Sequence, residues 1–364
     1  MRILCAPDKF KGTLTAADAA GAMARGAERV GRVETDCCPV ADGGEGTLEA
    51  LVAALGGRFE HVTVGDPLGR PVRASWAITP DGGTAIVELA RASGLALLSA
   101  DERDPSRTTT YGTGELIAAA MRKGCEEIIV GIGGSATCDG GAGLAQALGA
   151  RFFDSAGRLI EGPMTGGRLM AIARFEPPPD VPLIRVASDV VNPLCGPEGA
   201  AAVYGPQKGA TADQVAALER GLSHLAGIVG GEPAQAGAGA SGGAGFGLAA
   251  MCGATLEPGI NLVLEAVGFD VRCRCASLVL TGEGRLDEQS GYGKACSGVA
   301  RAAARLGIPV TAIVGSRAGA GPGAEFAQVI SLEERFGRAR AMGEAAALLE
   351  QVSEEAVKGL IASR

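Results

Sequence analysis

The chain has 364 residues, of which 47% are hydrophobic, and it carries a formal net charge of −8 at pH 7. The length favours two domains with an ample core, and the negative charge argues against a nucleic-acid partner. No apolar run approaches the roughly 20 residues that a membrane span needs, so we expect no membrane partner.

The N-terminus enters a predicted strand at Arg2–Ala6 without the long apolar region of a signal peptide. Ten cysteines are scattered along the chain, and neither Cys37-Cys38 nor Cys273-Arg-Cys275 has the paired spacing of a zinc site. We therefore expect a cytoplasmic protein with reduced thiols.

The first sixty residues alternate strands, glycine loops and helices. Thr15–Asp18 matches a capping box that opens a helix ending near Gly31. A second strand is predicted over Thr35–Val40, and the glycine-rich loop 41–47 leads into a helix over Leu48–Leu55. This rhythm is typical of a parallel α/β sheet.

From Arg58 the pattern changes. Arg58–Val64, Pro71–Ile78 and Thr84–Leu89 read as strands separated by short turn sequences, which predicts an antiparallel meander. We expect a helix over Gly112–Lys123 and a hairpin over Ala150–Ile160.

The stretch Ile128–Gly149 has the strongest local signal. Its first residues form a predicted strand, which runs into six glycines within thirteen residues and then into an alanine- and leucine-rich helix. A strand, a glycine turn and a helix N-terminus together present N–H groups and a positive dipole end to an anion. Ser135, Thr137 and Asp139 add two hydroxyls and a carboxylate, a set that suits a phosphate, a metal or a polyol. Alternatively, the glycines only relieve crowding in a tight turn.

Leu183–Ser188 predicts a strand that ends at Asp189. Thr211–Gln214 caps another predicted helix. The low-complexity segment Ala234–Gly247 is either a flexible linker or a ligand-embracing loop before a short helix at Leu248–Cys252.

The C-terminal third returns to parallel-strand character at Ser277–Thr281, Val310–Gly315 and Gln328–Leu332, and its last helix, Gly343–Ile361, has an apolar stripe that we interpret as core packing.

The predicted fold class is α/β. We expect a Rossmann-like doubly wound domain over residues 1–60 plus 270–364, with a second mixed α/β domain, 61–269, inserted and carrying glycine-rich ligand loops.

One dinucleotide signature is present. Gly131–Ala136 satisfies G-x-G-x-x-A, and Asp154 lies about twenty residues further on, as a dinucleotide site requires. However, Asp139–Gly141 intervenes before the helix, and Asp154 falls in a hairpin turn. These two mismatches make the dinucleotide site the weaker interpretation. An NAD-dependent oxidoreductase of a small hydroxy acid is kept as the alternative function.

The inventory of reactive side chains favours phosphoryl transfer. Only two histidines occur, so no Ser-His-Asp or Cys-His pairing is credible. Only six lysines occur against twenty-seven arginines, and four of them lie near glycine in loop-like sequences. Carboxylates, lysines, hydroxyls and glycine loops suit a reaction in which positioning and charge stabilisation do most of the catalysis.

Eight short sequences, in this order along the chain, resemble the type I glycerate kinases, a bacterial family that acts on D-glycerate. They are Phe10–Gly12, Ala41–Thr47, Asp66–Arg70, Thr110–Glu115, Gly131–Thr137, Asn192–Gly196, Gly205–Ala210 and Thr281–Arg285.

The resemblance runs from Ala6 to about Gly315. It implies phosphorylation of D-glycerate, with ATP and Mg²⁺ as cofactors, to 2-phosphoglycerate rather than 3-phosphoglycerate. It also implies a flavodoxin-like domain with a less regular inserted one, and it leaves a homo-oligomer open. Six positions depart from the family pattern and concern substrate detail more than reaction class: Lys9, Cys138, Ser188, Val191, Ser241 and Cys296.

Lys11 and Lys208 are predicted catalytic lysines that contact the phosphate or the glycerate carboxylate, and the alternative is that both are ordinary loop lysines. Ser135 and Thr137, with the N–H groups around Gly133 and Gly134, are predicted to hold part of the nucleotide or the substrate.

Two further binding candidates, Asp42 and Asn192, lie within the resembling sequences.

The remaining candidates are arginines and acidic residues near glycine turns. Arg70 and Arg285 are predicted to clamp a carboxylate bidentately, or else to form surface salt bridges. Glu283 and Asp287 are predicted to position Mg²⁺, with Lys294 facing the same phosphates; a Glu283–Lys294 ion pair without a ligand role is the alternative.

Asp189 is the main candidate for chemistry. It follows an apolar strand and precedes Asn192-Pro193, which places a carboxylate at a strand's carboxyl end. Such a group can accept the proton of the glycerate hydroxyl as that hydroxyl attacks the γ-phosphate. It could instead bind Mg²⁺, or cap the turn.

Overall fold

The computed structural model describes residues 1–42, 44, 46–286, 295–318 and 325–362. The chain is a mixed α/β protein that divides into two compact units. Unit 1 consists of Met1–Asp42, Glu49–Gly56 and Gly259–Arg364, and unit 2 of Gly43–Leu48 and Gly57–Pro258. These boundaries lie earlier in the chain than the sequence-based boundaries after residues 60 and 269.

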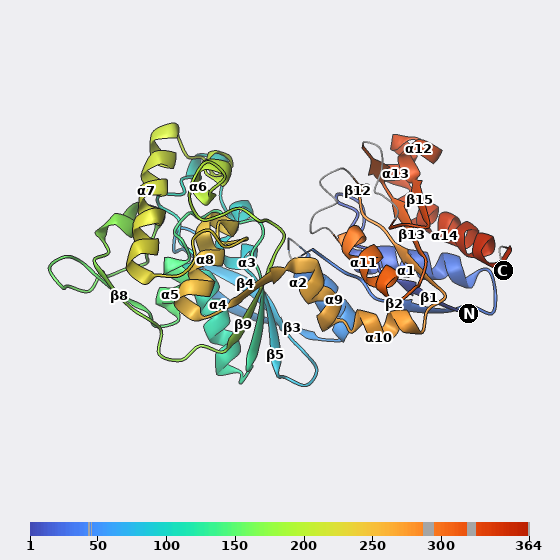
Figure 1. Cartoon of the computed structure of the whole chain (residues 1–364), viewed down its shortest axis with the longest axis horizontal. Helices are drawn as coiled ribbons and strands as arrows, with labels where there is room; N and C mark the ends of the chain where they lie inside the picture. Colours follow the sequence, from blue (N-terminus) through green and yellow to red (C-terminus); the bar gives the residue numbers. More distant parts are fainter. Residues whose placement is uncertain (43, 45, 287–294, 319–324, 363–364) are drawn as a thin grey trace. The chain divides into compact units, whose positions relative to one another are not determined.

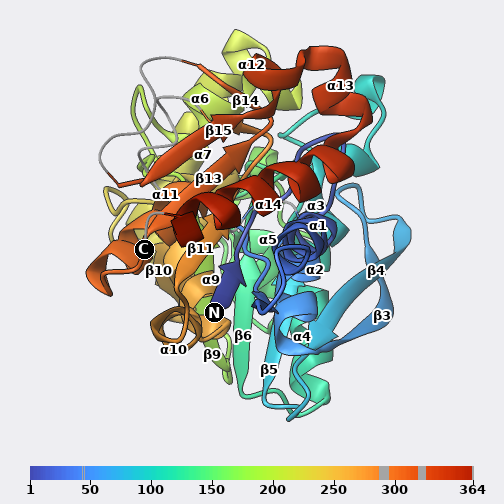
Figure 2. The same cartoon turned by 90° about the vertical axis from the view of Figure 1, so that its right-hand side faces the viewer.

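Unit 1 is organised around a five-stranded sheet in the order β15-β13-β11-β1-β2, in which every neighbouring pair is parallel. Figure 2 shows β15, β13 and β11 in this order. The strands are β1 (Arg2–Cys5), β2 (Glu34–Cys37), β11 (Leu278–Thr281), β13 (Val310–Val314) and β15 (Gln328–Ser331). Strands β11 and β13 are buried along their whole length, as parallel strands covered on two faces are. A short parallel pair, β12 (Arg285–Leu286) and β14 (Ser316–Arg317), follows them.

Seven helices of unit 1 lie wholly within the described residues: α1 (Ala16–Glu28), α9 (Gly259–Ala266), α10 (Phe269–Arg274), α11 (Ala295–Arg305), α12 (Leu332–Phe336), α13 (Arg338–Gly343) and α14 (Ala345–Ala362). The predicted cap of α1 is confirmed, because the Thr15 side chain accepts the Asp18 N–H at 3.1 Å.

The core of unit 1 lies on the two sides of β13. Ile313 packs in a buried cluster with α1 and α14, whereas Ala312 and Val314 pack with Cys296 of α11. Because successive side chains of a strand point to opposite faces, helices cover both faces of this strand.

Unit 2 contains a six-stranded mixed sheet in the order β10-β9-β6-β5-β4-β3 (Figure 2). Its strands are β3 (Arg58–Gly65), β4 (Pro71–Ile78), β5 (Thr84–Glu88), β6 (Glu127–Gly131), β9 (Leu183–Ser188) and β10 (Thr255–Pro258). The predicted antiparallel meander is confirmed in β3, β4 and β5. The other neighbouring pairs are parallel, so β5, β6, β9 and β10 end at one edge of the sheet.

The helices of unit 2 are α3 (Ala90–Ser93), α4 (Tyr111–Arg122), α5 (Ala142–Ala147), α6 (Ala200–Tyr204), α7 (Ala212–Val229) and α8 (Ala240–Cys252), with short 3₁₀ turns between them. Helices α6 and α7 lie side by side (Figure 1). The capping box predicted at Thr211–Gln214 is present. One further helix, α2 (Thr47–Leu55), is divided between the two units after Leu48.

The predicted hairpin over Ala150–Ile160 is only partly correct. The turn forms, but β7 (Arg151–Phe153) makes its main pairing with β8 (Arg174–Glu176), and a single bridge joins Phe153 to Leu159. The pairing with β8 has cation–π support, since the Arg174 guanidinium lies 3.8 Å from the centroid of the Phe153 ring.

The linker interpretation of Ala234–Gly247 is wrong. Residues Gly242 to Leu248 are buried within α8, and the Gly140 N–H donates to the Gly242 carbonyl at 3.0 Å. Ser241, Gly242 and Gly243 have φ values of 54°, 69° and 87°, a left-handed kink that glycine accommodates. The glycines therefore serve close backbone packing against the loop after β6.

Gly242 offers a test of this close packing. A Cβ added there would lie 1.9 Å from the Thr137 carbonyl oxygen, whereas Gly253, with the same φ of +69°, has open space around it. We expect Gly253→Ala to cost about 1–2 kcal/mol of stability, for the left-handed backbone alone. Gly242→Ala should cost at least about 2 kcal/mol more, because the backbone must also shift. Equal losses in urea unfolding of the two variants would contradict the close approach.

All ten cysteines are free thiols, as predicted. Among the helices of the described residues, none is both long and apolar enough to span a membrane.

Candidate functional site

A cavity of about 260 Å³ opens in unit 2 where β6 and β9 end. Its walls come from the loop after β6 (residues 132–135), the end of β9 (187–190), Gln207 and Lys208, and the start of α8 (240–241). The carboxyl ends of neighbouring parallel strands are where open α/β sheets bind ligands. The cavity therefore gathers three predicted site segments that lie far apart in the sequence.

Lys208 and Ser135 form the polar centre of this cavity. The Lys208 side chain is only 3% exposed, and its Nζ donates to Ser135 Oγ and to the Thr137 carbonyl oxygen, both at 2.7 Å. An ammonium has three N–H donors, so one remains for a ligand. An ordinary loop lysine would extend into solvent, whereas the Lys208 ammonium is buried. The structure therefore disfavours the interpretation of Lys208 as an ordinary loop lysine.

Burial also changes the acidity of this lysine. Loss of hydration lowers the pKa of Lys208 to about 8, while the nearby Cys138 and Asp139 act in the opposite direction. At neutral pH the group is still mainly a cation. It can pair with a carboxylate or a phosphate in the cavity.

Asp139 holds the glycine loop from inside. Its Oδ2 accepts the N–H and the hydroxyl of Thr110, both at 2.8 Å, and its Oδ1 accepts the Gly141 N–H at 3.2 Å. Burial raises the pKa of Asp139, and these hydrogen bonds oppose the rise. Because the Asp139 carboxylate already accepts these hydrogen bonds from the protein, we assign Asp139 to holding the loop in its conformation rather than to binding a ligand.

The two other predicted groups of this loop differ in accessibility. Gly133 and Gly134 line the cavity. Thr137 is fully buried, and its carbonyl, not its hydroxyl, points to Lys208. In the described part of the chain its Oγ1 has no hydrogen-bond partner.

Asp189 follows β9 directly and lines the same cavity as Lys208 and Ser135. Asn192 does not line the cavity. Its Nδ2 donates to the Glu198 carbonyl at 2.8 Å, and its Oδ1 accepts the Tyr204 hydroxyl at 2.7 Å. Tyr204 does line the cavity.

Several lining residues were missed by sequence reasoning, namely Ser188, Tyr204, Gln207 and Ser241. Three of the four carried a signal: Gln207 belongs to one of the resembling sequences, and Ser188 and Ser241 are among the positions that depart from the family pattern. Tyr204 carried none.

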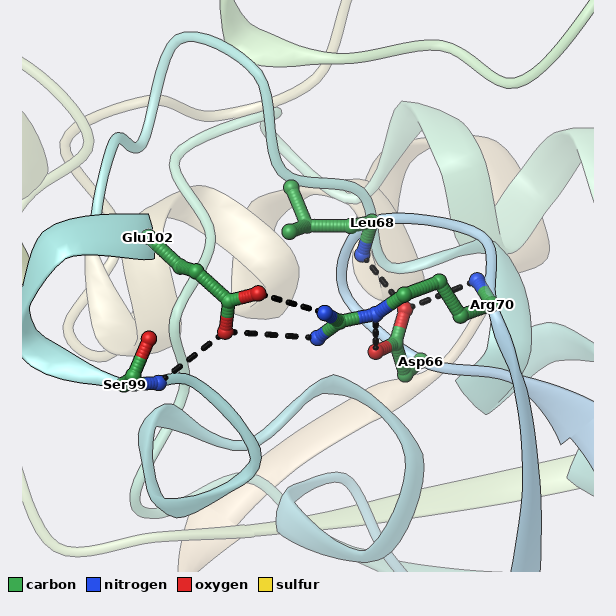
Figure 3. A network of polar contacts seen from close by, with 5 residues as sticks. All are labelled: Asp66, Leu68, Arg70, Ser99 and Glu102. Carbon is green, nitrogen blue, oxygen red and sulfur yellow. Dashed lines mark hydrogen bonds and ion pairs between the residues drawn. The ribbon is translucent and has the colours of Figure 1, made fainter.

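Arg70 is engaged with two carboxylates of its own unit (Figure 3). Its Nε donates to Asp66 Oδ2 at 2.6 Å, and its terminal nitrogens contact Glu102. Arg70 does not line the cavity around Lys208. The structure therefore favours the salt-bridge interpretation of this arginine over the substrate clamp.

Lys11 and Arg285 lie in unit 1, where they line a larger cavity of about 530 Å³. Both side chains are exposed. The predicted anion role of Lys11 therefore concerns the cavity of unit 1.

Three acidic residues of unit 1 come after strands of its parallel sheet: Asp8 after β1, Asp42 after β2 and Glu283 after β11. Burial has the largest effect on Asp8 and the negative charge of Asp42 the next largest, and together they raise the pKa of Asp8 to about 7. The positive charge of Lys9 and the hydrogen bond from the Lys9 N–H act in the opposite direction. Burial and then Glu283 raise the pKa of the Cys296 thiol, with a smaller effect of Asp8. Asp8 was missed by the sequence analysis, although it follows the first strand directly.

Two predicted residues, Asp287 and Lys294, lie outside the described residues. Within the described ranges, no group of three or more His, Cys, Asp or Glu has the arrangement of a metal site.

The dinucleotide interpretation finds no support in the loop geometry. A dinucleotide site needs a helix to begin at the third small residue of G-x-G-x-x-A. Here α5 begins at Ala142, six residues after Ala136, and its N-cap Gly141 has a φ of 74°.

Comparisons with known proteins agree with one another. The model of the Glycerate kinase family matches residues 3–361. The chain is 49% identical to the Glycerate kinase of Bacillus subtilis (strain 168) over 87% of this chain and 85% of that protein. It is 45% identical to the Glycerate 2-kinase of Escherichia coli (strain K12), with the same shares covered.

A solved structure is similar over the whole length. A crystal structure from Salmonella typhimurium LT2, described as a glycerate kinase 2, superposes with a TM-score of 0.89 at 40% identity. The match covers 100% of this chain and 99% of that one.

Proposed function

Because the chain belongs to the glycerate kinase family, we propose that it transfers the γ-phosphoryl group of ATP to D-glycerate, with Mg²⁺ and with 2-phosphoglycerate as the product. The 2-position is supported by the Glycerate 2-kinase of Escherichia coli, which is 45% identical. The observation that carries the proposal is the cavity in which Lys208, Ser135 and Asp189 meet.

In this cavity a cation and a carboxylate face a space suited to a small hydroxy acid. The glycerate carboxylate pairs with the remaining N–H of Lys208 and the Ser135 hydroxyl, which the buried ammonium already orients at 2.7 Å. The N–H groups around Gly133 and Gly134 add neutral donors. A low-dielectric cavity strengthens each of these contacts.

Asp189 then accepts the proton of the reacting hydroxyl. As that oxygen forms a bond to the γ-phosphorus, the bond from the γ-phosphorus to the β–γ bridging oxygen breaks, and ADP leaves with the electron pair. Removing the proton makes the hydroxyl oxygen a better nucleophile. A metal-binding role of Asp189 is the second interpretation of the same position.

The acidic residues of unit 1 fit a magnesium ion chemically. Asp8, Asp42 and Glu283 carry the type of oxygen that Mg²⁺ prefers, although no three acidic residues of the described ranges have the arrangement of a metal site. The raised pKa of Asp8 reflects burial and a repulsion from Asp42 that a cation would relieve. When bound, Mg²⁺ would neutralise phosphate charge. Asp287 stays a predicted ligand.

The proposal includes the domain architecture. Unit 1 is the flavodoxin-like, doubly wound domain, and unit 2 is inserted in it. This is supported by the all-parallel order β15-β13-β11-β1-β2, which corresponds to the flavodoxin order 2-1-3-4-5.

The direct test is a reaction with purified protein, D-glycerate, ATP and Mg²⁺, in which ADP release is followed. ³¹P NMR then identifies the product, because a phosphate on C2 couples to one proton and a phosphate on C3 to two. L-Glycerate serves as the control substrate. Binding of NADH without any ATP turnover would instead favour the oxidoreductase.

Metal removal gives a second prediction. After treatment with EDTA, ADP release should fall to background, and Mg²⁺ should restore it, since the phosphate charge would otherwise be left uncompensated. Full turnover in the presence of excess EDTA would contradict the magnesium requirement.

A further inference from the structure

The larger cavity lies in unit 1 and contains none of the residues Lys208, Ser135 and Asp189 to which the reaction above is assigned. It measures about 530 Å³, roughly the lower middle of the range of small-molecule sites. Its walls come from the segments after β1, β11 and β13, and from α12 and α13.

The position in the sheet is one where α/β folds bind ligands. In the order β15-β13-β11-β1-β2, the chain leaves β1 toward one side for β2 and returns on the other side at β11. The crevice outside the carboxyl ends at such a switch point is the usual ligand site. Phe10 and Lys11, after β1, and Gly284 and Arg285, after β11, line the cavity at this point.

The cavity is cationic in a protein whose net charge is −8. Four cations line it, Lys11, Arg285, Arg317 and Arg338, against the two carboxylates of Glu333 and Glu334.

One of these cations is neutralised locally, because Arg317 Nε donates to Glu334 at 2.7 Å. Lys11 and Arg338 have no ion-pair partner among the described residues. The positive charge that is left over faces the cavity, which favours an anionic ligand.

The same cavity also has an apolar wall. Phe10 and Ala341 are buried, with 2% and 7% of their surfaces exposed, whereas Met342 is 53% exposed. The Met342 thioether is flexible and polarizable, and such a group makes favourable contacts with aromatic rings, which include the flat ring of a ligand. A purely anionic ligand such as inorganic phosphate would leave this wall unused.

We propose that the unit 1 cavity binds the nucleotide, with its phosphates on Lys11 and Arg338 and its base against the wall of Phe10, Ala341 and Met342. The inference rests on the proposed function and deepens it. It assigns the nucleotide to unit 1 and the hydroxy acid to the smaller cavity of unit 2. The competing interpretation is that Lys11 and Arg338 are solvated surface cations.

Equilibrium binding of ATP to the full-length protein, measured by calorimetry without glycerate, tests this assignment. We expect Lys11→Gln and Arg338→Gln each to raise the Kd for ATP about fivefold, because each removes an exposed charged contact. The double variant should raise it about twentyfold. Both side chains are exposed, so folding is not at risk, and thermal unfolding verifies this.

Two control variants sharpen the result. Arg274→Gln removes an exposed arginine of unit 1 that does not line the cavity, and it should leave the Kd for ATP unchanged. Lys208→Met changes the unit 2 cavity and should also leave this Kd unchanged.

An unchanged Kd in the double variant would overturn the assignment, and so would a loss of ATP binding in Lys208→Met as large as in the double variant. Failure of the proposed function looks different: wild-type protein would bind ATP, lose affinity in the double variant, and still not phosphorylate glycerate.

Discussion

Asp189→Asn is expected to lower kcat by at least about a hundredfold while the fold is retained. Asparagine keeps the shape of the side chain and its hydrogen-bonding reach, but it cannot accept the proton of the attacking hydroxyl. Asp189 lines the cavity with Lys208 and Ser135, so the loss should appear in the chemical step. Steady-state kinetics with saturating D-glycerate and ATP measure it.

The matched control is Asp180→Asn. Asp180 is exposed and precedes β9, whereas Asp189 follows the same strand at its other end. We expect wild-type kcat for Asp180→Asn. A wild-type kcat for Asp189→Asn would end the assignment of the base. A raised Mg²⁺ requirement in Asp189→Asn, with kcat restored at high Mg²⁺, would instead assign Asp189 to the metal.

Lys208→Met should lower kcat/KM for D-glycerate about a hundredfold, or about 2.7 kcal/mol. The buried ammonium both orients Ser135 and supplies the positive charge for the substrate carboxylate, and methionine fills its volume without either function. Lys123→Met is the control, because Lys123 is exposed and its Nζ lies 3.4 Å from Glu60. Near-normal kinetics for Lys208→Met would contradict a role of this lysine in binding.

The same lysine predicts a pH dependence. Burial lowers the pKa of Lys208 to about 8, and the protonated form binds the substrate, so kcat/KM should fall as pH rises through about 8. The fall in kcat should occur at a higher pH than the fall in kcat/KM, because bound glycerate stabilises the protonated form of Lys208. In Lys208→Arg the fall should disappear, because arginine stays protonated. A fall near pH 8 that persists in Lys208→Arg would assign it to another group.

Local signals in the sequence were enough for much of the secondary structure. The cap at Thr15, the capping box at Thr211 and the meander from Arg58 to Glu88 depend on neighbouring residues, and all three are present in the structure. The resembling sequences were enough for the family. The chain has few lysines, and Lys208 is followed by a glycine. This local pattern predicted Lys208 as a site residue.

The contacts of the candidate site were decided by the tertiary structure. Ser135 and Lys208 are 73 residues apart, and only the packing of the loop after β6 against the turn before α7 joins them. The same packing turned the Thr137 hydroxyl and the Asp139 carboxylate inward. No local pattern reports which way a loop side chain points, because burial depends on segments that are remote in sequence.

Arg70 and the glycine-rich segment before Met251 show the same limit. Arg70 has the sequence context of a carboxylate clamp, yet Glu102, 32 residues away, already occupies its guanidinium. Gly242 and Gly243 have the composition of a linker, yet they allow α8 to approach the backbone of Thr137 and Gly140. Composition determines which conformations a segment can adopt, and only its distant neighbours select one of them.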